Sequence, residues 1–587
     1  MEQTGKKGMG YVLRRLLSCV GEYRKYVILT PIVMIGEVLM EVLIPRVMAK
    51  IVDVGIANSD TSYTIRMGLI MVGMALFSLL CGALGGRFAA VAGMGFAKNV
   101  RAKLFGKVQD FSFANVDKFS TASLITRLTT DTTNVQNTFM MLIRTAVRSP
   151  FMLICALIMA ISLNAKLATV FLVAIPVLGG VMAFITITAY PRFGKMLEKY
   201  DALNERVQEN LIGIRVVKAF VREKYEGDKF VASADEVRAA QVHAEKIVIL
   251  GMPAMQLSMY GCILAVLWFG GNMVTHGNML VGELSSFISY ITQILMSLMM
   301  LSMLFVMTTI SIASAKRITE VLDEVPDIDD EGADKSLVPA DGSIVFDHVS
   351  FSYSGEHGNY ALKDIDISIK SGETIGIIGG TGSAKTTLVQ LIPRLYDTVE
   401  GVVKVGGRDV RDYSLENLRN DVAMVLQKNV LFSGTIKENL KWGNENATDE
   451  EIEEACRQAQ AHDFIMSFPD KYETDLGQGG VNVSGGQKQR LCIARALLKK
   501  PKIIILDDST SAVDTATDAK IRDAFAEHLA DTTAIIIAQR ISSVQHADRI
   551  IVLDDGRIDA FDTHENLIKN NKIYREVYMS QQKGDEE

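Results

Sequence analysis

Long runs of apolar residues dominate the first half of the chain. Six of them are long enough to cross a bilayer as helices, which takes about 20 apolar residues each. They cover roughly residues 26–52, 67–97, 139–163, 167–190, 247–271 and 281–313. A shorter stretch, residues 11–20, surrounds two arginines with apolar residues and predicts a helix lying at the membrane surface. The pattern therefore predicts a helical membrane domain with six spans.

Lysine and arginine are concentrated in two of the connections between these runs. The stretches after the second and the fourth run are long and basic, whereas around residues 53–62, 164–166 and 272–279 only Lys166 is positive. Connections rich in Lys and Arg remain in the cytoplasm. We therefore expect a multi-pass protein of the cell membrane, with both termini and both basic connections in the cytoplasm. The basic connections are predicted to be helical extensions of the spans.

Charged side chains inside the predicted spans need a specific reason, because a bilayer makes them costly. Glu37 and Glu41 share one face of the first span, and Arg144 and Arg148 share one face of the third, since residues four apart lie on one side of a helix. Glu37 and Arg148 each lie about 16 residues, or ~24 Å, from the outer ends of their spans. We expect them to pair with each other or to face a translocation cavity.

The pattern changes after the last apolar run. Residues 324–342 are acidic, contain two prolines and lack apolar periodicity, which indicates a linker. Residues 344–346 and 349–353 then alternate as antiparallel strands do, and from Thr374 short apolar strands alternate with helical patterns. The predicted organisation is a transmembrane domain at 1–323, a linker at 324–342 and a layered α/β domain at 343–587.

Composition narrows the possible functions. Of the 587 residues, 49% are hydrophobic and 22% are charged, which fits a membrane domain joined to a water-exposed one. The net charge of -7 gives no basic surface for nucleic acid, so we expect no nucleic-acid partner. The six cysteines are scattered, without the short spacings of a metal site or a disulfide framework.

The strongest chemical signal lies at residues 374–387, where an apolar strand breaks into glycines and ends in a lysine and two threonines. It follows the pattern G-x-x-x-x-G-K-S/T, except that Ala384 replaces the last glycine. In such a loop backbone N–H groups surround phosphates, Lys385 reaches the β- and γ-phosphates, and the hydroxyl of Thr386 binds Mg²⁺. A second apolar strand ends in Asp507, which supplies another carboxylate on the Mg²⁺ side. We therefore expect ATP and Mg²⁺ as cofactors. The predicted phosphate-binding residues are Gly379, Gly380, Thr381, Gly382, Ser383, Ala384, Lys385, Thr386 and Thr387.

Residues 483–490, with the sequence Val-Ser-Gly-Gly-Gln-Lys-Gln-Arg, lie between the phosphate loop and the Asp507 strand. They resemble the signature segment of ATP-binding-cassette (ABC) proteins. With six spans ahead of it, nearly the whole chain resembles an ABC half-transporter of the exporter-type fold. The resemblance implies an α-helical six-span domain followed by an α/β P-loop ABC nucleotide-binding domain. Residues 117–128 and 209–220 are similar to the family's coupling regions, which dock onto the nucleotide-binding domains, the second onto that of the partner.

The resemblance also assigns roles to individual residues. Tyr353 would stack on adenine, and Gln427 would sense Mg²⁺ and the γ-phosphate. Asp514 matches the loop that crosses the dimer interface. The signature residues Ser484, Gly485, Gly486 and Gln487 would bind the γ-phosphate of ATP held by a second subunit. One chain would then carry half of each of two ATP sites.

Two residues depart from the family's catalytic pattern. Asp508 stands where the family has a glutamate as general base, and aspartate is shorter by one methylene, ~1.5 Å. A misplacement of ~1 Å can cost on the order of 10²-fold in rate. Gln539 stands where the family has a histidine that contacts the γ-phosphate. We therefore expect this chain's own site to bind ATP and hydrolyse it slowly. At Ala384 we expect alanine to tolerate a helical φ, so that nucleotide binding survives.

These departures predict a subunit of a heterodimer that resembles the degenerate-site subunit of bacterial multidrug-type ABC exporters. Its partner would be a second ABC half-transporter, whose competent site the intact signature completes. The expected activity is ATP-driven export of a drug-like, lipid or peptide substrate. Import of a metal chelate by the same fold, a slowly hydrolysing homodimer and a regulatory ABC subunit are the alternatives.

Overall fold

The computed structural model describes residues 8–355, 357–508, 515–528 and 531–585. The chain divides into two compact units. The first comprises Met1–Gln109 and Ser120–Glu324, and the second comprises Asp110–Phe119 and Val325–Glu587. The short segment Asp110–Phe119 thus belongs to the second unit, although it lies between two long helices of the first.

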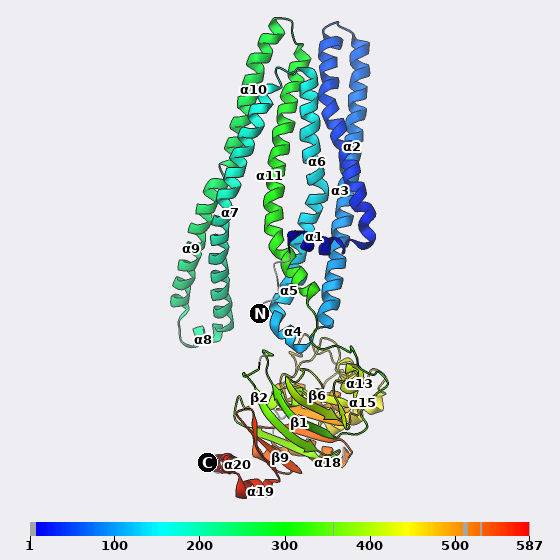
Figure 1. Ribbon diagram of the computed structural model, residues 1–587, viewed down its shortest axis with the longest axis vertical. Coiled ribbons are helices and arrows are strands. Elements are labelled where there is room, and N and C mark those ends of the chain that lie inside the picture. Colours follow the sequence, from blue (N-terminus) through cyan, green and yellow to red (C-terminus); the bar gives the residue numbers. More distant parts are fainter. Residues whose placement is uncertain (1–7, 356, 509–514, 529–530, 586–587) are drawn as a thin grey trace. The chain divides into compact units, whose positions relative to one another are not determined.

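The first unit is helical (Figure 1). Its described residues contain six helices, some of them continuous across short irregular turns, that are long and apolar enough to span a membrane, as predicted. The elements are α1 (Met9–Leu17), α2 (Arg24–Lys50), η2 (Ile51–Ile56), α3 (Thr61–Gln109), α5 (Thr121–Thr126), η3 (Arg127–Asp131), α6 (Thr132–Leu163), α7 (Thr169–Ile212), α8 (Ile214–Ala219), α9 (Glu223–Val248), α10 (Gly251–Thr275) and α11 (Val281–Asp323). The six long helices continue past the apolar runs, as expected of spans with helical extensions.

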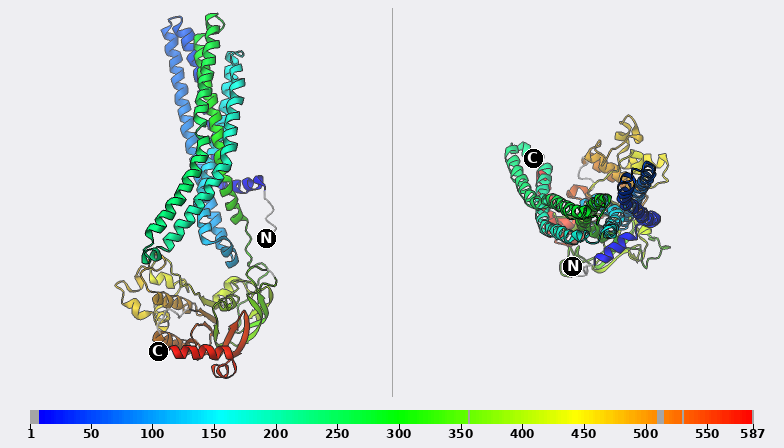
Figure 2. Two further views of the ribbon diagram at one scale, coloured as in Figure 1. Left: turned by 90° about the vertical axis from the view of Figure 1, so that its left-hand side faces the viewer. Right: turned by 90° about the horizontal axis from the view of Figure 1, so that it is seen from above.

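Helices α2, α3, α6 and α11 pack against one another, while α7 and α9 form a pair joined by α8 (Figures 1 and 2). Helix α7 also packs against α10 and α11. Part of the packing follows from a proline inside α2. Pro45 has no N–H to bond the carbonyl of Glu41, and the side-chain amide of Gln293 donates to that oxygen instead, at 3.2 Å. The hydroxyl of Tyr290 bonds the next carbonyl, that of Val42, at 2.9 Å. Side chains of α11 thus satisfy backbone groups of α2 where water is excluded.

Two polar contacts fix the C-terminal end of α11. Its last residue, Asp323, accepts hydrogen bonds from Tyr11 at 2.8 Å and from Arg15 at 2.9 Å, both in helix α1. One and a half turns earlier Arg317 donates to the buried carboxylate of Asp131 at 2.7 Å. The first contact holds α1 against the helix bundle, and the second ties α11 to the turn η3 that precedes α6.

The second unit has two sheets. Five parallel strands and one antiparallel edge strand form a sheet in the order β10-β9-β3-β8-β7-β6, and an antiparallel sheet has the order β2-β1-β4-β5. The strands are β1 (Ile344–Phe351), β2 (Leu362–Ile369), β3 (Thr374–Gly379), β4 (Glu400–Val405), β5 (Arg408–Asp409), β6 (Val422–Val425), β7 (Ile503–Asp507), β8 (Thr533–Ile537), β9 (Arg549–Asp554) and β10 (Arg557–Asp562). The two alternating segments expected around residues 344–353 form the single strand β1, with an irregular register after Phe346.

The parallel sheet is buried on both faces, because its strands are almost continuously apolar. Ile503 and Ile505 pack with the residues of the antiparallel sheet, whereas Ile504 and Leu506 pack with helices on the other side. The helices of this unit are α4 (Phe113–Phe119), α12 (Lys385–Gln390), α13 (Leu415–Asp421), α14 (Ile436–Leu440), α15 (Asp449–Gln458), α16 (His462–Met466), α17 (Gly485–Leu497), α18 (Thr515–His528), α19 (His564–Asn570) and α20 (Lys572–Asp585), with the short turns η4 (Lys471–Glu473) and η5 (Ile541–Ser543). The layered arrangement places the ends of β3, β7 and β8 together at one edge of the sheet.

Candidate nucleotide-binding site

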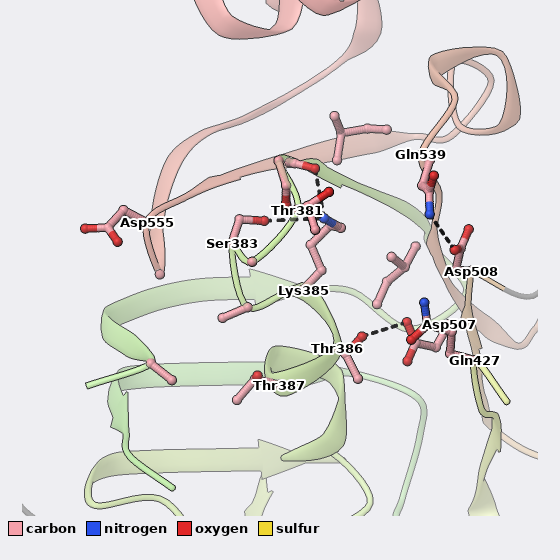
Figure 3. Close-up of a pocket in the computed structure, with 18 of the residues that line it drawn as sticks. Thr381, Ser383, Lys385, Thr386, Thr387, Gln427, Asp507, Asp508, Gln539 and Asp555 are labelled. Carbon is pink, nitrogen blue, oxygen red and sulfur yellow. Dashed lines mark hydrogen bonds between the residues drawn. The ribbon is translucent and has the colours of Figure 1, made fainter. Parts of the chain in front are cut away.

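A pocket of about 810 Å³ opens at this edge (Figure 3). Most of the candidate site residues predicted from the sequence line this pocket. The phosphate loop from Gly379 to Thr387 lines it, together with Tyr353, Gln427, Asp507, Asp508 and Gln539. Segments separated by more than 150 residues in the sequence therefore meet, as the order of the motifs predicts.

The phosphate loop connects β3 to α12, and its lysine is held inside it. The ammonium group of Lys385 donates to the carbonyls of Gly379 and Gly380, both at 2.8 Å. Burial lowers the pKa of Lys385, while the nearby carboxylates of Asp508 and Asp507 act in the opposite direction. Because a phosphate offers stronger acceptors than these carbonyls, Lys385 is placed to exchange them for β- and γ-phosphate oxygens.

Ala384 has a backbone conformation that favours glycine, the residue that the phosphate-loop pattern has at this position. Its φ of 70° and ψ of 27° lie in the left-handed region, not in the helical region that we expected from its place before α12. This expectation was wrong, because the loop must turn sharply to bring its N–H groups inward. A left-handed conformation costs an alanine ~1–2 kcal/mol. The loop is therefore strained at this residue.

Two of the three residues expected to hold Mg²⁺, Thr386 and Asp507, lie side by side, and the third, Gln427, lines the same pocket. The hydroxyl of Thr386 donates to Asp507 Oδ1 at 3.0 Å, as Figure 3 shows. Asp507 Oδ2 is buried and has no hydrogen-bond partner among the described residues. Burial raises the pKa of the Asp507 carboxyl, against the hydrogen bond from Thr386. A half-buried hydroxyl next to a buried carboxylate oxygen that has no partner among the described residues fits a hard divalent cation such as Mg²⁺.

Asp508 and Gln539 contact each other at the end of the pocket. The side-chain amide of Gln539 donates to Asp508 Oδ2 at 2.7 Å (Figure 3). The backbone of Gln539 is held in turn by Gln581 of α20, whose amide donates to the Gln539 carbonyl at 2.9 Å and accepts from the N–H of Ile541 at 2.8 Å. No sequence motif indicated Gln581, because α20 lies outside the family's motifs.

Tyr353 lies at the entrance, where its side chain is 55% exposed and available to stack on a base. Its hydroxyl is within 2.8 Å of that of Thr387, and its ring contacts Tyr396 edge-on, with centroids 5.3 Å apart. Tyr396 is buried and donates to Asp117 of α4 at 2.8 Å. Burial, and then the Asp117 carboxylate, raise the pKa of Tyr396, so its hydroxyl stays protonated. Tyr353, the residue expected to stack on the base, is thus connected to α4 through the single side chain of Tyr396. No sequence motif indicated this connection.

Comparisons with known proteins agree with this geometry. Residues 27–299 match the family described as "ABC transporter transmembrane region", and residues 362–511 match "ABC transporter". The "Uncharacterized ABC transporter ATP-binding protein YfiB" of Bacillus subtilis (strain 168) is 39% identical over 569 residues, which cover 97% of this chain and 98% of the relative.

The chain belongs to the ABC transporter family. Another relative, the "ATP-dependent lipid A-core flippase" of Desulfotalea psychrophila, is 33% identical over 497 residues, which cover 83% of this chain and 85% of the relative. The solved structure of a bacterial Atm1-family ABC exporter with ATP bound has a similar fold, with a TM-score of 0.81 at 24% identity, over 95% of this chain and 98% of that one. The protein is thus a multi-pass ABC transporter with an exporter-type fold, and its nucleotide-binding domain binds ATP and couples hydrolysis to transport.

The signature residues of this transporter lie apart from the pocket. Ser484 caps the start of α17: its hydroxyl accepts from the N–H of Gln487 at 3.3 Å, and the Gln487 side chain accepts from the N–H of Ser484 at 2.8 Å. Gly485 and Gly486 form the first turn of that helix, and none of these four residues lines the pocket. Asp514 lies outside the described residues.

Proposed function

We propose that this ABC transporter is one subunit of a heterodimeric exporter, with a degenerate ATP site of its own. In this proposal the site built on Lys385, Thr386 and Asp507 binds Mg·ATP and hydrolyses it slowly. A second half-transporter supplies the other half of each site, including a catalytic glutamate in the competent one.

The contact between Asp508 and Gln539 carries the proposal. The carboxylate is one methylene shorter than glutamate, and one of its oxygens accepts a hydrogen bond from an amide. That hydrogen bond occupies a carboxylate oxygen that a general base would have to offer to the attacking water. An amide at position 539 also lacks the positive charge that a protonated histidine brings to a γ-phosphate.

The elements that bind nucleotide are retained, which favours a long-lived ATP clamp over a chain that has lost nucleotide binding. Thr386, Asp507 and Gln427 would hold Mg²⁺, which neutralises phosphate charge when it is bound. The capping box that orders Ser484 and Gln487 at the start of α17 leaves the signature available to a partner's nucleotide.

The substrate is proposed to be hydrophobic or amphiphilic. An apolar cavity of about 610 Å³ lies within the membrane unit and is lined by α7, α9, α10 and α11, with Met182, Phe193, Met299 and Phe305 among its side chains. Methionine and phenylalanine side chains adapt to varied apolar ligands. A relative is named for the transport of lipid A-core, which supports the same class. The positive charge of the basic connections supports a location in the cell membrane with both termini in the cytoplasm, as part of this proposal.

The test is steady-state ATPase activity of the purified chain alone and of the chain co-purified with a candidate partner. We expect slow hydrolysis by the chain alone and fast hydrolysis by the pair. Changing the partner's catalytic glutamate to glutamine should abolish the fast rate, whereas Asp508→Asn in this chain should leave most of it. Rapid turnover by the chain alone would contradict the proposal.

A further inference from the structure

A cluster of charged side chains lies inside the membrane unit, apart from the nucleotide pocket. Arg148 of α6 donates two hydrogen bonds to the Glu41 carboxylate of α2, at 2.8 and 3.0 Å, and its Nε lies 3.4 Å from Glu37 Oε1. The expected pairing of Glu37 with Arg148 is therefore present, but Glu41 is the closer partner. Gly82 of α3 leaves room for the Glu37 carboxyl, since a Cβ there would lie 3.4 Å from its carbon.

The charges in this cluster do not balance. Two carboxylates face one guanidinium, and among the described residues Arg148 is the one cation within 4.0 Å of either. The Glu37 side chain is 10% exposed, so its excess charge lies in a region of low polarity. An ionised group in such a place is stable only when an opposite charge reaches it.

Two buried side-chain oxygens on α2 and α11 have no hydrogen-bond partner among the described residues: Glu37 Oε2 and Gln293 Oε1. Gln293 belongs to the same place, because its amide nitrogen donates to the Glu41 carbonyl. Both atoms are acceptors, so a ligand that satisfies them must bring hydrogen-bond donors or positive charge. The partial exposure of Glu41 and Arg148, 29% and 31%, leaves one side of the cluster open to such a ligand.

We propose that Glu37, with Glu41 and Gln293 beside it, binds the positively charged group of an organic cation whose remaining surface is apolar. Arg148 stays on Glu41 and prevents the two carboxylates from repelling each other. The cluster and the apolar cavity share helix α11, on which Gln293 and Met299 are separated by ~9 Å of helical rise. This inference rests on the proposed transport function and narrows its substrate class to amphiphilic cations.

The experiment uses tetraphenylphosphonium and tetraphenylborate, two ions of similar size and shape with opposite charge. Equilibrium binding of each is measured with the full chain in detergent, without nucleotide or partner. Glu37→Gln removes the excess charge and should weaken tetraphenylphosphonium binding at least ~10-fold without weakening tetraphenylborate. Arg148→Gln raises the negative charge and should strengthen tetraphenylphosphonium binding. Glu205→Gln, which changes an exposed carboxylate of α7, is the matched control and should alter neither.

Thermal unfolding shows which variants are folded. If Glu37→Gln is not, Glu37→Asp replaces it and should keep the preference for the cation. The proposal would be overturned if Glu37→Gln weakened the binding of both ions equally. It would also be overturned if Glu37→Gln and Arg148→Gln both weakened tetraphenylphosphonium binding. Either result would identify a structural ion pair. Unchanged cation binding in Glu37→Gln would overturn it too. None of these outcomes affects the ATPase test of the heterodimer, which involves other residues and a partner.

Discussion

Gln539 Nε2 lies 2.7 Å from Asp508 Oδ2, so the two residues that depart from the catalytic pattern of ABC proteins contact each other. Each departure alone would lower activity. Together they are hydrogen-bonded: Gln539, at the position of the family's histidine, donates to an oxygen of Asp508, at the position of the family's catalytic glutamate. This pair explains why the site would retain ATP.

Replacing Asp508 by the longer glutamate should therefore restore hydrolysis fully only when the hydrogen bond from Gln539 is also removed. We expect the double variant Asp508→Glu with Gln539→His to raise the ATPase rate of this chain's site by up to ~10²-fold, and either single change to give less. The measurement is single-turnover hydrolysis in a dimer whose other site carries an inactivated glutamate. Asp523→Glu, an exposed change in α18, is the control and should have no effect. A double variant no faster than the original chain would mean that another feature limits the site.

The strain at Ala384 predicts a stabilising substitution. Ala384→Gly removes a Cβ from a residue with φ of 70° and should stabilise the nucleotide-binding unit by ~1 kcal/mol. Gly382→Ala is the opposite change, at φ of 86°, and none of the described atoms lies within 4 Å of the added Cβ. It should destabilise by ~1 kcal/mol through the backbone alone. Thermal unfolding of the nucleotide-free chain measures both, and shifts of the same sign would contradict the argument.

The hydrogen bond from Tyr396 to Asp117 predicts an energetic link between the base-stacking region and α4. Tyr396→Phe should cost ~1–2 kcal/mol, because a hydrogen bond to a charged acceptor is lost. Asp117→Asn should cost less, since asparagine still accepts. A double-mutant cycle by thermal unfolding should give a coupling energy above ~0.5 kcal/mol. Additive effects would mean that the contact contributes little.

The raised pKa of Asp507 predicts a pH dependence with a definite sign. A carboxyl whose pKa is higher in the folded chain than its ordinary 3.8 binds a proton more tightly when folded. Its contribution to stability is then complete below pH 3.8 and is lost as the pH rises through the folded pKa. Asp507→Asn cannot ionise, so its stability relative to the parent should grow as the pH rises across this window. Thermal unfolding without Mg²⁺ measures the difference, and adding Mg²⁺ with nucleotide should favour the parent.

The sequence predicted the broad fold because its patterns are local. Apolar runs are long enough to identify the spans, and the strand before Gly379 and the strand ending at Asp507 carry their own signals. The contacts that adjust the site were not predictable in this way. Tyr396 and Asp117 are 279 residues apart, and Gln581 and Gln539 are 42 apart, so only packing brings them together. The prediction of a helical φ for Ala384 was wrong, because this φ is set by the turn of the loop and not by the helix that follows.

Gln581 connects helix α20 to the loop that carries Gln539, at the edge of the nucleotide pocket. It bonds the backbone on both sides of Arg540, and α20 ends only four residues later, at Asp585. A truncation that removes α20 would therefore act on the loop that carries Gln539.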